Sequence, residues 1–354
     1  MKTEIMEKLP MHSPWLMNHK DTITIPIHSG ANGREEEFKL LALATVTGFP
    51  LLLRGDAGTA KSMIISEFAE AVSSGNSKIF SLLVDDFMHP SEIVGKPDME
   101  KFFDPSKPQY YIDCPIIDAE FIFLDEIHNS NSGFRNALLP IMAGRELHQG
   151  KKRLKLNYYT FISAVNEFPK NSDQKAFWDR YVFKHTVSRL SEGQYFEHLS
   201  ASEPYCYDIC LPGMDLMEQH MDIPYHKLSV IYNACRNAGA SDRTLLKLPS
   251  IIKTIRTIWK VTIDDAIIKA AYFISGMAIG TEVKKNIYPK HIQEIRSKID
   301  ILSAYNNSKF QESYEMIFND INSLMKQGIL TDEEHTVLMQ EMENIQKKKL
   351  IPKK

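Results

Sequence analysis

A short glycine-containing loop holds the first residues of this 354-residue sequence whose types and spacing could do chemistry. Residues 55–62, GDAGTAKS, fit the phosphate-loop pattern G-x-x-x-x-G-K-[ST], except that Ala60 stands where the second glycine is usual. In such a loop the backbone N–H groups converge on phosphate oxygens, the lysine reaches the β- and γ-phosphates, and the hydroxyl binds Mg²⁺. We therefore predict that eight residues bind a nucleoside triphosphate, the last of them also holding the metal: Gly55, Asp56, Ala57, Gly58, Thr59, Ala60, Lys61 and Ser62.

The context of this loop separates nucleotide binding from a chance Gly-Lys turn. The apolar run PLLLRG, residues 50–55, is typical of a buried strand. Residues 61–75 then place apolar side chains at helical spacing and end at Gly75. Because strand, glycine-containing turn and helix are the context that confirms the pattern, the sequence favours a nucleotide site over a chance turn.

Two carboxylates follow a second buried strand. In FIFLDEIH, residues 121–128, four apolar residues bring Asp125 and Glu126 to the carboxyl end of a strand, where ligands of open α/β sheets bind. Asp125 is a candidate for the Mg²⁺ shell, and Glu126 can activate a water against the γ-phosphate. The alternative is an ordinary acidic turn, which the phosphate loop upstream disfavours. We interpret His128 beside them as a packing or hydrogen-bonding residue.

Three more polar residues are candidates for the same site. Asn166 ends the apolar run of residues 159–165, and its amide could orient a water if that strand lies next to the strand of Glu126. Arg180 and Arg243 could stabilise the charge that develops on a transferred phosphoryl group, from the same or a neighbouring subunit. The alternative for each arginine is a structural salt bridge.

These side chains require a scaffold that brings strand ends together. Apolar runs at residues 79–84, 121–125 and 159–165 alternate with helical stretches such as 132–143. This alternation predicts an α/β fold, with a parallel sheet covered by helices on both faces. The proline-rich stretch 88–115 interrupts the alternation, so we interpret it as an insertion.

Beyond about residue 222 no buried-strand pattern returns, and the chain is predicted to continue as helices. An apolar stripe at helical spacing runs from Tyr314 to Met325, Gly328 ends that helix, and a capping box at Thr331 opens the next. The predicted organisation is an N-terminal arm (1–34), an αβα core (35–195) with the insertion near 88–115, a connecting segment (196–222), an all-helical lid (223–285), and a C-terminal helical hairpin with a basic tail (286–354).

Composition and charge exclude several other classes of protein. The 42 Lys and Arg residues against 45 Asp and Glu give a net charge of −3, so we do not expect nucleic-acid binding through a general positive field. The four cysteines make no disulfide framework, and CYDIC, residues 206–210, lacks a second pair at zinc-ligand spacing. No stretch has the roughly 20 apolar residues of a membrane helix. We therefore expect a cytoplasmic protein without a membrane partner.

Six motifs taken together resemble the MoxR branch of the AAA+ ATPases, and within it the RavA-type members. They are GDAGTAKS (55–62), SEIVG (91–95), FIFLDEIHNSNSGFRNALLPIMAGRE (121–146), FISAVNEFP (161–169), AFWDRYVF (176–183) and ASDRTLL (240–246). The resemblance covers roughly residues 35–285, in family order and spacing. An alanine before the loop lysine is itself usual in RavA-like members.

The resemblance implies a role for each candidate residue and an architecture for the whole. The implied roles are Walker A for Lys61 and Ser62, Walker B for Asp125 and Glu126, sensor 1 for Asn166, an arginine finger that reaches a neighbouring subunit for Arg180, and sensor 2 for Arg243. The implied fold is the AAA+ P-loop αβα domain with an all-helical lid. The implied cofactors are ATP and Mg²⁺, and the implied assembly is a homo-oligomeric ring, a hexamer, with the insertion at 88–115 facing its pore.

Three functions then compete. The favoured one is an ATP-hydrolysing, chaperone-like motor that remodels or matures a protein client; family analogy suggests a client or co-factor with a von Willebrand factor A domain. The second is a nucleic-acid-acting motor of the same helix-2-insert clade, of restriction or defence type. The third, a catalytically silent nucleotide-gated scaffold, is disfavoured because Glu126 and Arg180 are both present.

Overall fold

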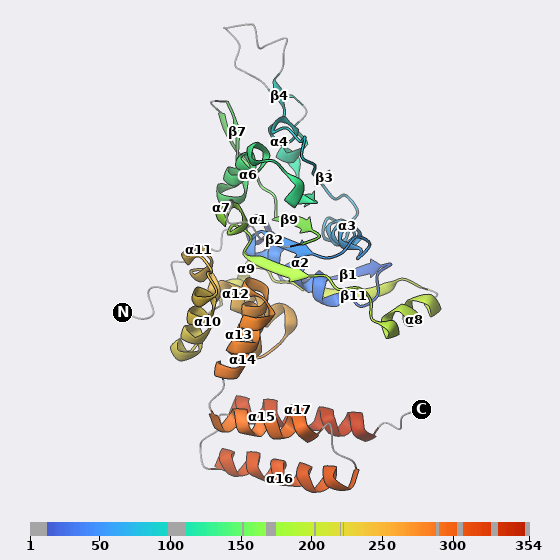
Figure 1. The fold of residues 1–354 in the computed structure, drawn as a ribbon, viewed down its shortest axis with the longest axis vertical. Helices are drawn as coiled ribbons and strands as arrows, with labels where there is room; N and C mark the ends of the chain where they lie inside the picture. Colours follow the sequence, from blue (N-terminus) through green and yellow to red (C-terminus); the bar gives the residue numbers. More distant parts are fainter. Residues whose placement is uncertain are drawn as a thin grey trace. The chain divides into compact units, whose positions relative to one another are not determined.

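The computed structural model describes most of the chain (Figure 1). The described residues are 13–97, 111–112, 114–150, 152–167, 175–201, 203–219, 221, 223–287, 290–302, 307–326 and 332–350. Contacts within the chain divide it into two compact units, Met1–Val283 and Lys284–Lys354. All the candidate site residues belong to the first unit.

Five parallel strands form the central sheet of the first unit, in the order β10-β2-β9-β6-β3. The strands are β2 (Leu51–Arg54), β3 (Ile79–Leu83), β6 (Phe121–Asp125), β9 (Thr160–Val165) and β10 (Phe183–Thr186). The predicted α/β class with a parallel sheet is confirmed, and four of the strands coincide with predicted runs. The fifth, β10, is an edge strand of sequence FKHT, too short and polar to be predicted from apolar pattern.

Helices cover both faces of this sheet (Figure 1). On one face α3 packs on β6, where the Phe68 and Phe121 ring centroids are 6.1 Å apart. On the other face Leu124 of β6 shares a buried cluster with Phe134 of α6. Burial on both faces explains why these strands are continuous apolar runs. The covering helices are α2 (Glu35–Thr47), α3 (Lys61–Val72) and α6 (Ser132–Gly144).

The predicted N-terminal arm and connecting segment differ from the structure. Strand β1 (Ile23–Ser29), from the arm, pairs antiparallel with β11 (Tyr205–Leu211), from the connection, so that Ile25 lies opposite Ile209. Both sequences, ITIPIHS and YCYDICL, largely alternate apolar and polar residues, the pattern of half-buried strands. Residues 23–29 and 205–211 therefore form a small sheet of the first unit, while residues 1–12 of the predicted arm lie outside the described residues.

Seven further short elements of the α/β part lie outside the predicted insertion. They are α1 (Pro14–Asn18), η2 (Ile127–Asn129), β7 (Glu146–Gln149), β8 (Lys152–Lys155), α7 (Lys175–Trp178), α8 (Glu192–Ser200) and α9 (Met214–Glu218). Strands β7 and β8 pair antiparallel as a hairpin. Helix α7 lies just before β10 in the chain, so it helps to place Arg180.

The proline-rich insertion predicted near 88–115 is described only in part. It begins with α4 (Ser91–Val94) and a short antiparallel pair, β4 (Lys96–Pro97) with β5 (Tyr111–Ile112). It ends with η1 (Pro115–Asp118). Residues 98–110 and 113 of the predicted insertion lie outside the described residues.

A helical region follows β11 and packs on the sheet. Helix α12 contacts α2 and α13, and α13 reaches the edge strand β10. Pro249 stands in the first turn of α12, where its missing N–H costs no hydrogen bond. The helices are α10 (Tyr225–Asn237), α11 (Asp242–Leu245), α12 (Leu248–Trp259), α13 (Ile263–Ser275) and α14 (Met277–Ile287).

The second unit has three helices among its described residues, where the sequence predicted a hairpin of two. They are α15 (Lys290–Leu302), α16 (Asn307–Lys326) and α17 (Asp332–Leu350). The predicted stripe supplies Ile317 and Ile321 to the core, and the additional helix α15 supplies Ile295 and Ile299 at helical spacing. Of the predicted basic tail, residues 347–350 belong to α17 and 351–354 lie outside the described residues. Within the described ranges of both units, no helix is long and apolar enough to cross a membrane.

Candidate nucleotide-binding site

The predicted phosphate loop connects β2 to α3 and is tightly packed at its start. The Gly55 N–H donates to the Val165 carbonyl oxygen at the end of β9, at 3.0 Å. A Cβ on Gly55 would lie only 2.8 Å from both the Thr59 Oγ1 and the Val187 carbonyl oxygen. Glycine is therefore required here, because a side chain would collide with the backbone of Val187, the residue that follows β10.

The departure from the phosphate-loop pattern has a visible backbone consequence. Ala60, at the position of the usual glycine, has φ 65° and ψ 20°, the left-handed conformation that costs a non-glycine residue about 1–2 kcal/mol. Lys61 follows as the first residue of α3 and is only 8% exposed. Its Nζ donates to the carbonyl oxygens of Gly55 (2.6 Å) and Asp56 (3.1 Å), so the ammonium group lies inside the loop.

The two predicted metal ligands are in contact. The Ser62 Oγ donates to Oδ2 of Asp125 at 3.1 Å, which connects the start of α3 to the end of β6. The other oxygen of Asp125, Oδ1, accepts the Glu126 N–H at 3.0 Å. A hydroxyl and a carboxylate are the oxygen ligands that Mg²⁺ prefers, so the pair fits this ion.

Glu126 and Asn166 are also brought together, because β9 pairs with β6 as predicted. The Asn166 Nδ2 lies 3.0 Å from each carboxylate oxygen of Glu126 and donates to them. The backbone of Glu126 is left-handed, with φ 55° and ψ 33°, a strained conformation that is common at functional sites. The Asn166 Oδ1 is buried and has no hydrogen-bond partner in the described part of the chain.

His128 is a neighbour of this carboxylate that the sequence did not assign to the site. Its Nδ1 lies 3.4 Å from Oε2 of Glu126, because the turn η2 folds the chain back directly after β6. Its place two residues after the predicted base is the signal that could have suggested this contact. The carboxylate of the base candidate thus accepts hydrogen bonds from the Asn166 amide and has the His128 imidazole beside its Oε2 atom.

The residues at this edge of the sheet fit a magnesium-bound nucleoside triphosphate. Lys61 supplies a cation within the loop, and the twelve-residue α3 presents its N-terminus, where anions are favoured. Ser62 and Asp125 carry oxygen atoms that would suit the metal, and the buried Oδ1 of Asn166 has no hydrogen-bond partner among the described residues. The donor set therefore suits the predicted cofactors.

The two arginines lie elsewhere. Val182, just after Arg180, donates its N–H to the Pro50 carbonyl oxygen at the beginning of β2, whereas the phosphate loop follows the end of β2. A four-residue strand is about 13 Å long, so Arg180 belongs to the amino edge of the sheet and the loop to the carboxyl edge. The structure thus separates Arg180 from Glu126 within one chain.

Arg180 and Arg243 are instead close to each other. Burial and the positive charge of Arg243 both lower the pKa of the Arg180 guanidinium, while Asp179 opposes this effect. The Arg180 side chain donates to the Ala176 carbonyl oxygen, but its Nε is buried without a hydrogen-bond partner among the described residues. The two predicted phosphate-stabilising arginines therefore form one cationic group on the amino-edge side.

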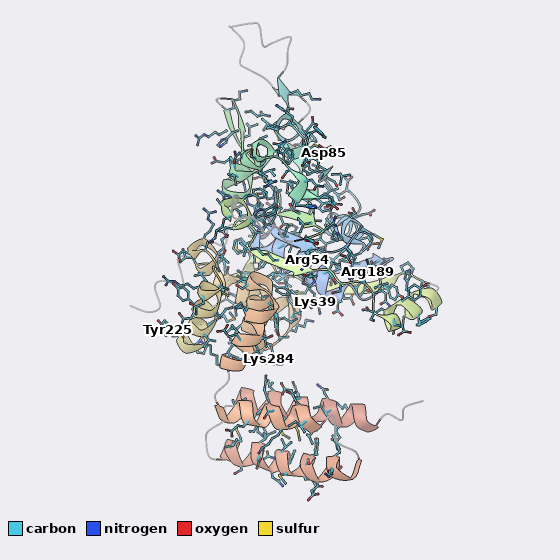
Figure 2. All side chains as sticks on the ribbon, viewed as in Figure 1. Lys39, Arg54, Asp85, Arg189, Tyr225 and Lys284 are labelled. Carbon is cyan, nitrogen blue, oxygen red and sulfur yellow. The ribbon has the colours of Figure 1, made fainter. Side chains whose placement is uncertain are left out.

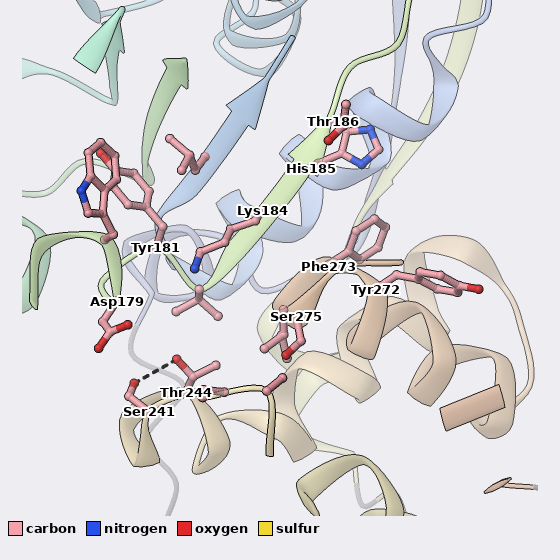
Figure 3. A pocket seen from close by; sticks show the side chains of 18 of the residues that line it. Asp179, Tyr181, Lys184, His185, Thr186, Ser241, Thr244, Tyr272, Phe273 and Ser275 are labelled. Carbon is pink, nitrogen blue, oxygen red and sulfur yellow. Dashed lines mark hydrogen bonds between the residues drawn. The ribbon is translucent and has the colours of Figure 1, made fainter. Parts of the chain in front are cut away.

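A cavity of about 700 Å³ lies between β10 and the helical region (Figure 3). Lys184 of β10 and Asp179 line one side, and Ser241 and Thr244 of the helical region line the other. Burial lowers the pKa of Lys184, and the negative charge of Asp179 partly offsets this shift. None of the phosphate-loop residues lines this cavity, so it is separate from the candidate nucleotide site.

The sequence matches a known protein family. A family model described as the MoxR domain in the MoxR-vWA-beta-propeller ternary systems matches residues 19–204, more than half of the chain. The chain belongs to the MoxR family. The matched residues contain the phosphate loop, the carboxylate pair, Asn166 and Arg180, so the site described above lies in the MoxR domain.

Two curated relatives match part of this MoxR chain. One is a structural protein of Acidianus two-tailed virus, 31% identical over 151 residues, which are 42% of this chain and 24% of that protein. The other is an uncharacterised protein of Methanocaldococcus jannaschii, 28% identical over 172 residues, which are 49% of this chain and 44% of that protein. The matches span less than half the length of each relative.

The fold is also that of a solved structure. The crystal structure of a proposed ATPase from Cytophaga hutchinsonii superposes with a TM-score of 0.53 at 16% identity, over 69% of this chain and 82% of that one. At this identity the likeness concerns the fold alone. Together with the family match, it shows a MoxR-type AAA+ P-loop fold.

Proposed function

We propose that this MoxR-family protein hydrolyses ATP with Mg²⁺ and uses the energy to remodel a protein partner. The observation that carries the proposal is the hydrogen-bonded set at the carboxyl edge of the sheet, where Ser62 meets Asp125 and Asn166 meets Glu126. Family membership alone supports an ATPase fold, whereas this set supports turnover because it includes both metal ligands and a base.

Each residue of the set has a proposed task. Lys61 neutralises the β- and γ-phosphates from inside the loop, and Ser62 and Asp125 hold the metal, which would neutralise charge on the phosphates. Glu126 accepts a proton from the attacking water. Asn166 keeps the carboxylate in place through its amide N–H groups and offers its free Oδ1 to the same water.

The two arginines support hydrolysis between subunits. Arg180 lies at the opposite edge of the sheet from the phosphate loop, too far to reach a nucleotide in its own chain. We propose that Arg180 and Arg243 act as arginine finger and sensor 2 toward the nucleotide of a neighbouring subunit in a homo-oligomeric ring, a hexamer. The cavity between β10 and the helical region would give the lid space to move during the cycle.

The proposed partner is a von Willebrand factor A domain protein. The matching family model is described by systems that contain such a domain. Co-purification of a tagged copy with such a protein, lost when Lys61 is replaced by Ala, would support this partner. Absence of co-purification with both the wild type and the variant would contradict it.

The RavA-type branch remains part of the proposal. The four cysteines are free, which agrees with a cytoplasmic location.

A nucleic-acid motor is the less favoured alternative. The net charge of −3 gives no general attraction to phosphate backbones. We expect weak binding to random duplex or single-stranded DNA at about 150 mM salt, measured by fluorescence anisotropy. Submicromolar binding would favour the nucleic-acid motor over the protein-remodelling one.

The proposed activity is tested by steady-state ATP hydrolysis together with nucleotide binding. The wild-type protein should hydrolyse ATP only with Mg²⁺ present. Lys61→Ala should weaken binding of a fluorescent ATP analogue, because the buried ammonium that faces the phosphates is removed. Lys39→Ala, which removes a lysine from the surface ion pair with Glu35, is the matched control and should bind normally. A wild-type protein that neither binds nor hydrolyses ATP would contradict the proposal.

A further inference from the structure

An exposed ion pair stands at the rim of the phosphate loop. The Nε of Arg189 donates to Oδ2 of Asp56, the second residue of the loop, at 3.1 Å. The Arg189 and Asp56 side chains are 77% and 65% exposed. Figure 2 shows Arg189 near the carboxyl end of β2, where Arg54 is labelled. None of the six motifs contains Arg189, so it could not be assigned to the site from the sequence.

The fold holds Arg189 at this position through its backbone. The Val187 N–H donates to the Arg54 carbonyl oxygen at 2.7 Å, so the chain continues alongside β2 beyond the end of β10. The Val187 carbonyl oxygen then faces Gly55 so closely that a Cβ there would lie 2.8 Å away. Arg189, two residues later, is therefore tied to the loop by contacts that do not involve its own side chain.

Asp56 creates an electrostatic difficulty for a loop that accepts phosphates. It is the one acidic residue in GDAGTAKS, and its carboxylate repels a polyphosphate at short range. The backbone of Asp56 cannot easily withdraw, because its carbonyl oxygen accepts hydrogen bonds from the Lys61 Nζ (3.1 Å) and the Thr59 Oγ1 (2.9 Å). A cation must therefore lie beside this carboxylate to neutralise it, and Arg189 occupies that position.

We propose that Arg189 is a positioning residue of the nucleotide site in its own subunit, where it neutralises Asp56 so that the loop can accept a triphosphate. This inference rests on the proposed ATP binding. It differs from an ordinary surface ion pair, which adds little to stability and nothing to ligand affinity. It also differs from direct phosphate contact, because the effect of Arg189 should depend on the charge of Asp56.

A double-mutant cycle separates these possibilities. The dissociation constant of a fluorescent ATP analogue with Mg²⁺ is measured for the wild type, Arg189→Ala, Asp56→Asn and the double variant. Arg189→Ala should weaken binding about 3- to 10-fold at about 50 mM salt, and less at about 500 mM, because the pair is exposed and screened. The double variant should bind close to the wild type, since no carboxylate remains to be offset. Arg189→Lys should retain most of the affinity.

Controls make each outcome decisive. Arg153→Ala removes an exposed arginine on β8 and should leave affinity unchanged. Thermal unfolding of each variant checks that the fold is intact. A loss of the same size with and without Asp56, or no loss at all, would overturn the inference while leaving the proposed function standing. Absence of ATP binding by the wild type would instead overturn the proposed function, and this inference with it.

Discussion

The two edges of the central sheet carry different kinds of polar chemistry. At the carboxyl edge, hydrogen bonds join the carboxylates after β6 to Ser62 and Asn166, so nearly every candidate group has a partner. On the amino-edge side, Arg180 lies near Arg243, and Lys247 is influenced by Arg243 as well. The Lys247 Nζ lies 4.0 Å from the ring centroid of Phe49, just before β2. The carboxylates of the carboxyl edge are hydrogen-bonded within the chain, whereas the amino-edge side gathers cations whose mutual repulsion Asp179 offsets only in part.

This difference fits the proposed ring, in which each subunit would contribute its carboxyl edge to one nucleotide site and its amino-edge cations to another. Like charges that lie close together cost free energy unless an anion offsets them. The phosphate loop of the same chain is at the other edge of the sheet, so its nucleotide cannot be that anion. A nucleotide bound to a neighbouring subunit would supply this anion, and the two edges would then serve two different nucleotide sites.

The largest effect is expected from Arg180→Ala. An arginine that stabilises the charge of a transferred phosphoryl group is worth about 10³–10⁵-fold in turnover. The variant should lose most ATP hydrolysis but still bind ATP, because Arg180 is far from the phosphate loop of its own chain. Steady-state turnover and analogue binding measure the two effects. Weakened binding by isolated subunits would place Arg180 at its own nucleotide and remove the distinction between the edges.

Glu126→Gln should reduce turnover about 10²–10⁴-fold, the usual contribution of a general base. The amide has nearly the shape of the carboxylate, so ATP binding should persist. Asn166 can still donate to the remaining carbonyl oxygen, so the fold should be unaffected. Turnover at the wild-type rate in a steady-state assay would show that the hydrogen-bonded carboxyl edge does not hold the base.

A smaller effect concerns the stability cost of the amino-edge cations. Burial, with Arg243 and Arg145, lowers the pKa of Lys247 from 10.5 to about 8. Between pH 8 and pH 10.5, Lys247 binds more protons in the unfolded chain than in the folded one. The charged lysine therefore destabilises the fold most below pH 8, and this destabilisation fades as the pH rises toward 10.5. Lys247→Gln should therefore raise the free energy of unfolding near neutral pH by about 2 kcal/mol, after allowing for the lost cation–π contact.

Urea unfolding of Lys247→Gln and the wild type across this pH range measures the difference. The gain should shrink as the pH rises above 8. Lys253→Gln is a comparison in helix α12, which begins directly after Lys247, because burial lowers the pKa of Lys253 while the charge of Glu218 opposes this shift. If Lys247→Gln is less stable than the wild type near neutral pH, favourable contacts of Lys247 outweigh the cost of burying its charge.

The sheet and the carboxyl-edge residues could be predicted from sequence because their signals are local. A strand buried on both faces, such as β6, must be a continuous apolar run, and the polar residue that ends it marks the ligand edge. The predicted neighbourhood of Asn166 and Glu126 followed from this reasoning, and the pairing of β9 with β6 confirms it.

The remaining features depend on residues far apart in the chain. Strands β1 and β11 are only half buried, and their pairing becomes visible only when both sequences are placed side by side. The contact of Arg189 with Asp56 depends on how β10 continues past β2, and β10 itself carries Lys184 and His185 on a short edge strand. Helix α15 is a third case, because its buried residues Ile292, Ile295 and Ile299 lie on a helix that packs against the later helices α16 and α17.

If the site is completed between subunits, two inactive variants, Glu126→Gln and Arg180→Ala, should restore activity to each other when they are mixed. In a mixed ring, the intact Glu126 of one subunit can meet the intact Arg180 of its neighbour. We predict that ATP hydrolysis partly returns on mixing, with a maximum at intermediate ratios, while each variant alone stays inactive. No recovery at any ratio, with mixed rings demonstrated by native mass spectrometry, would contradict the account.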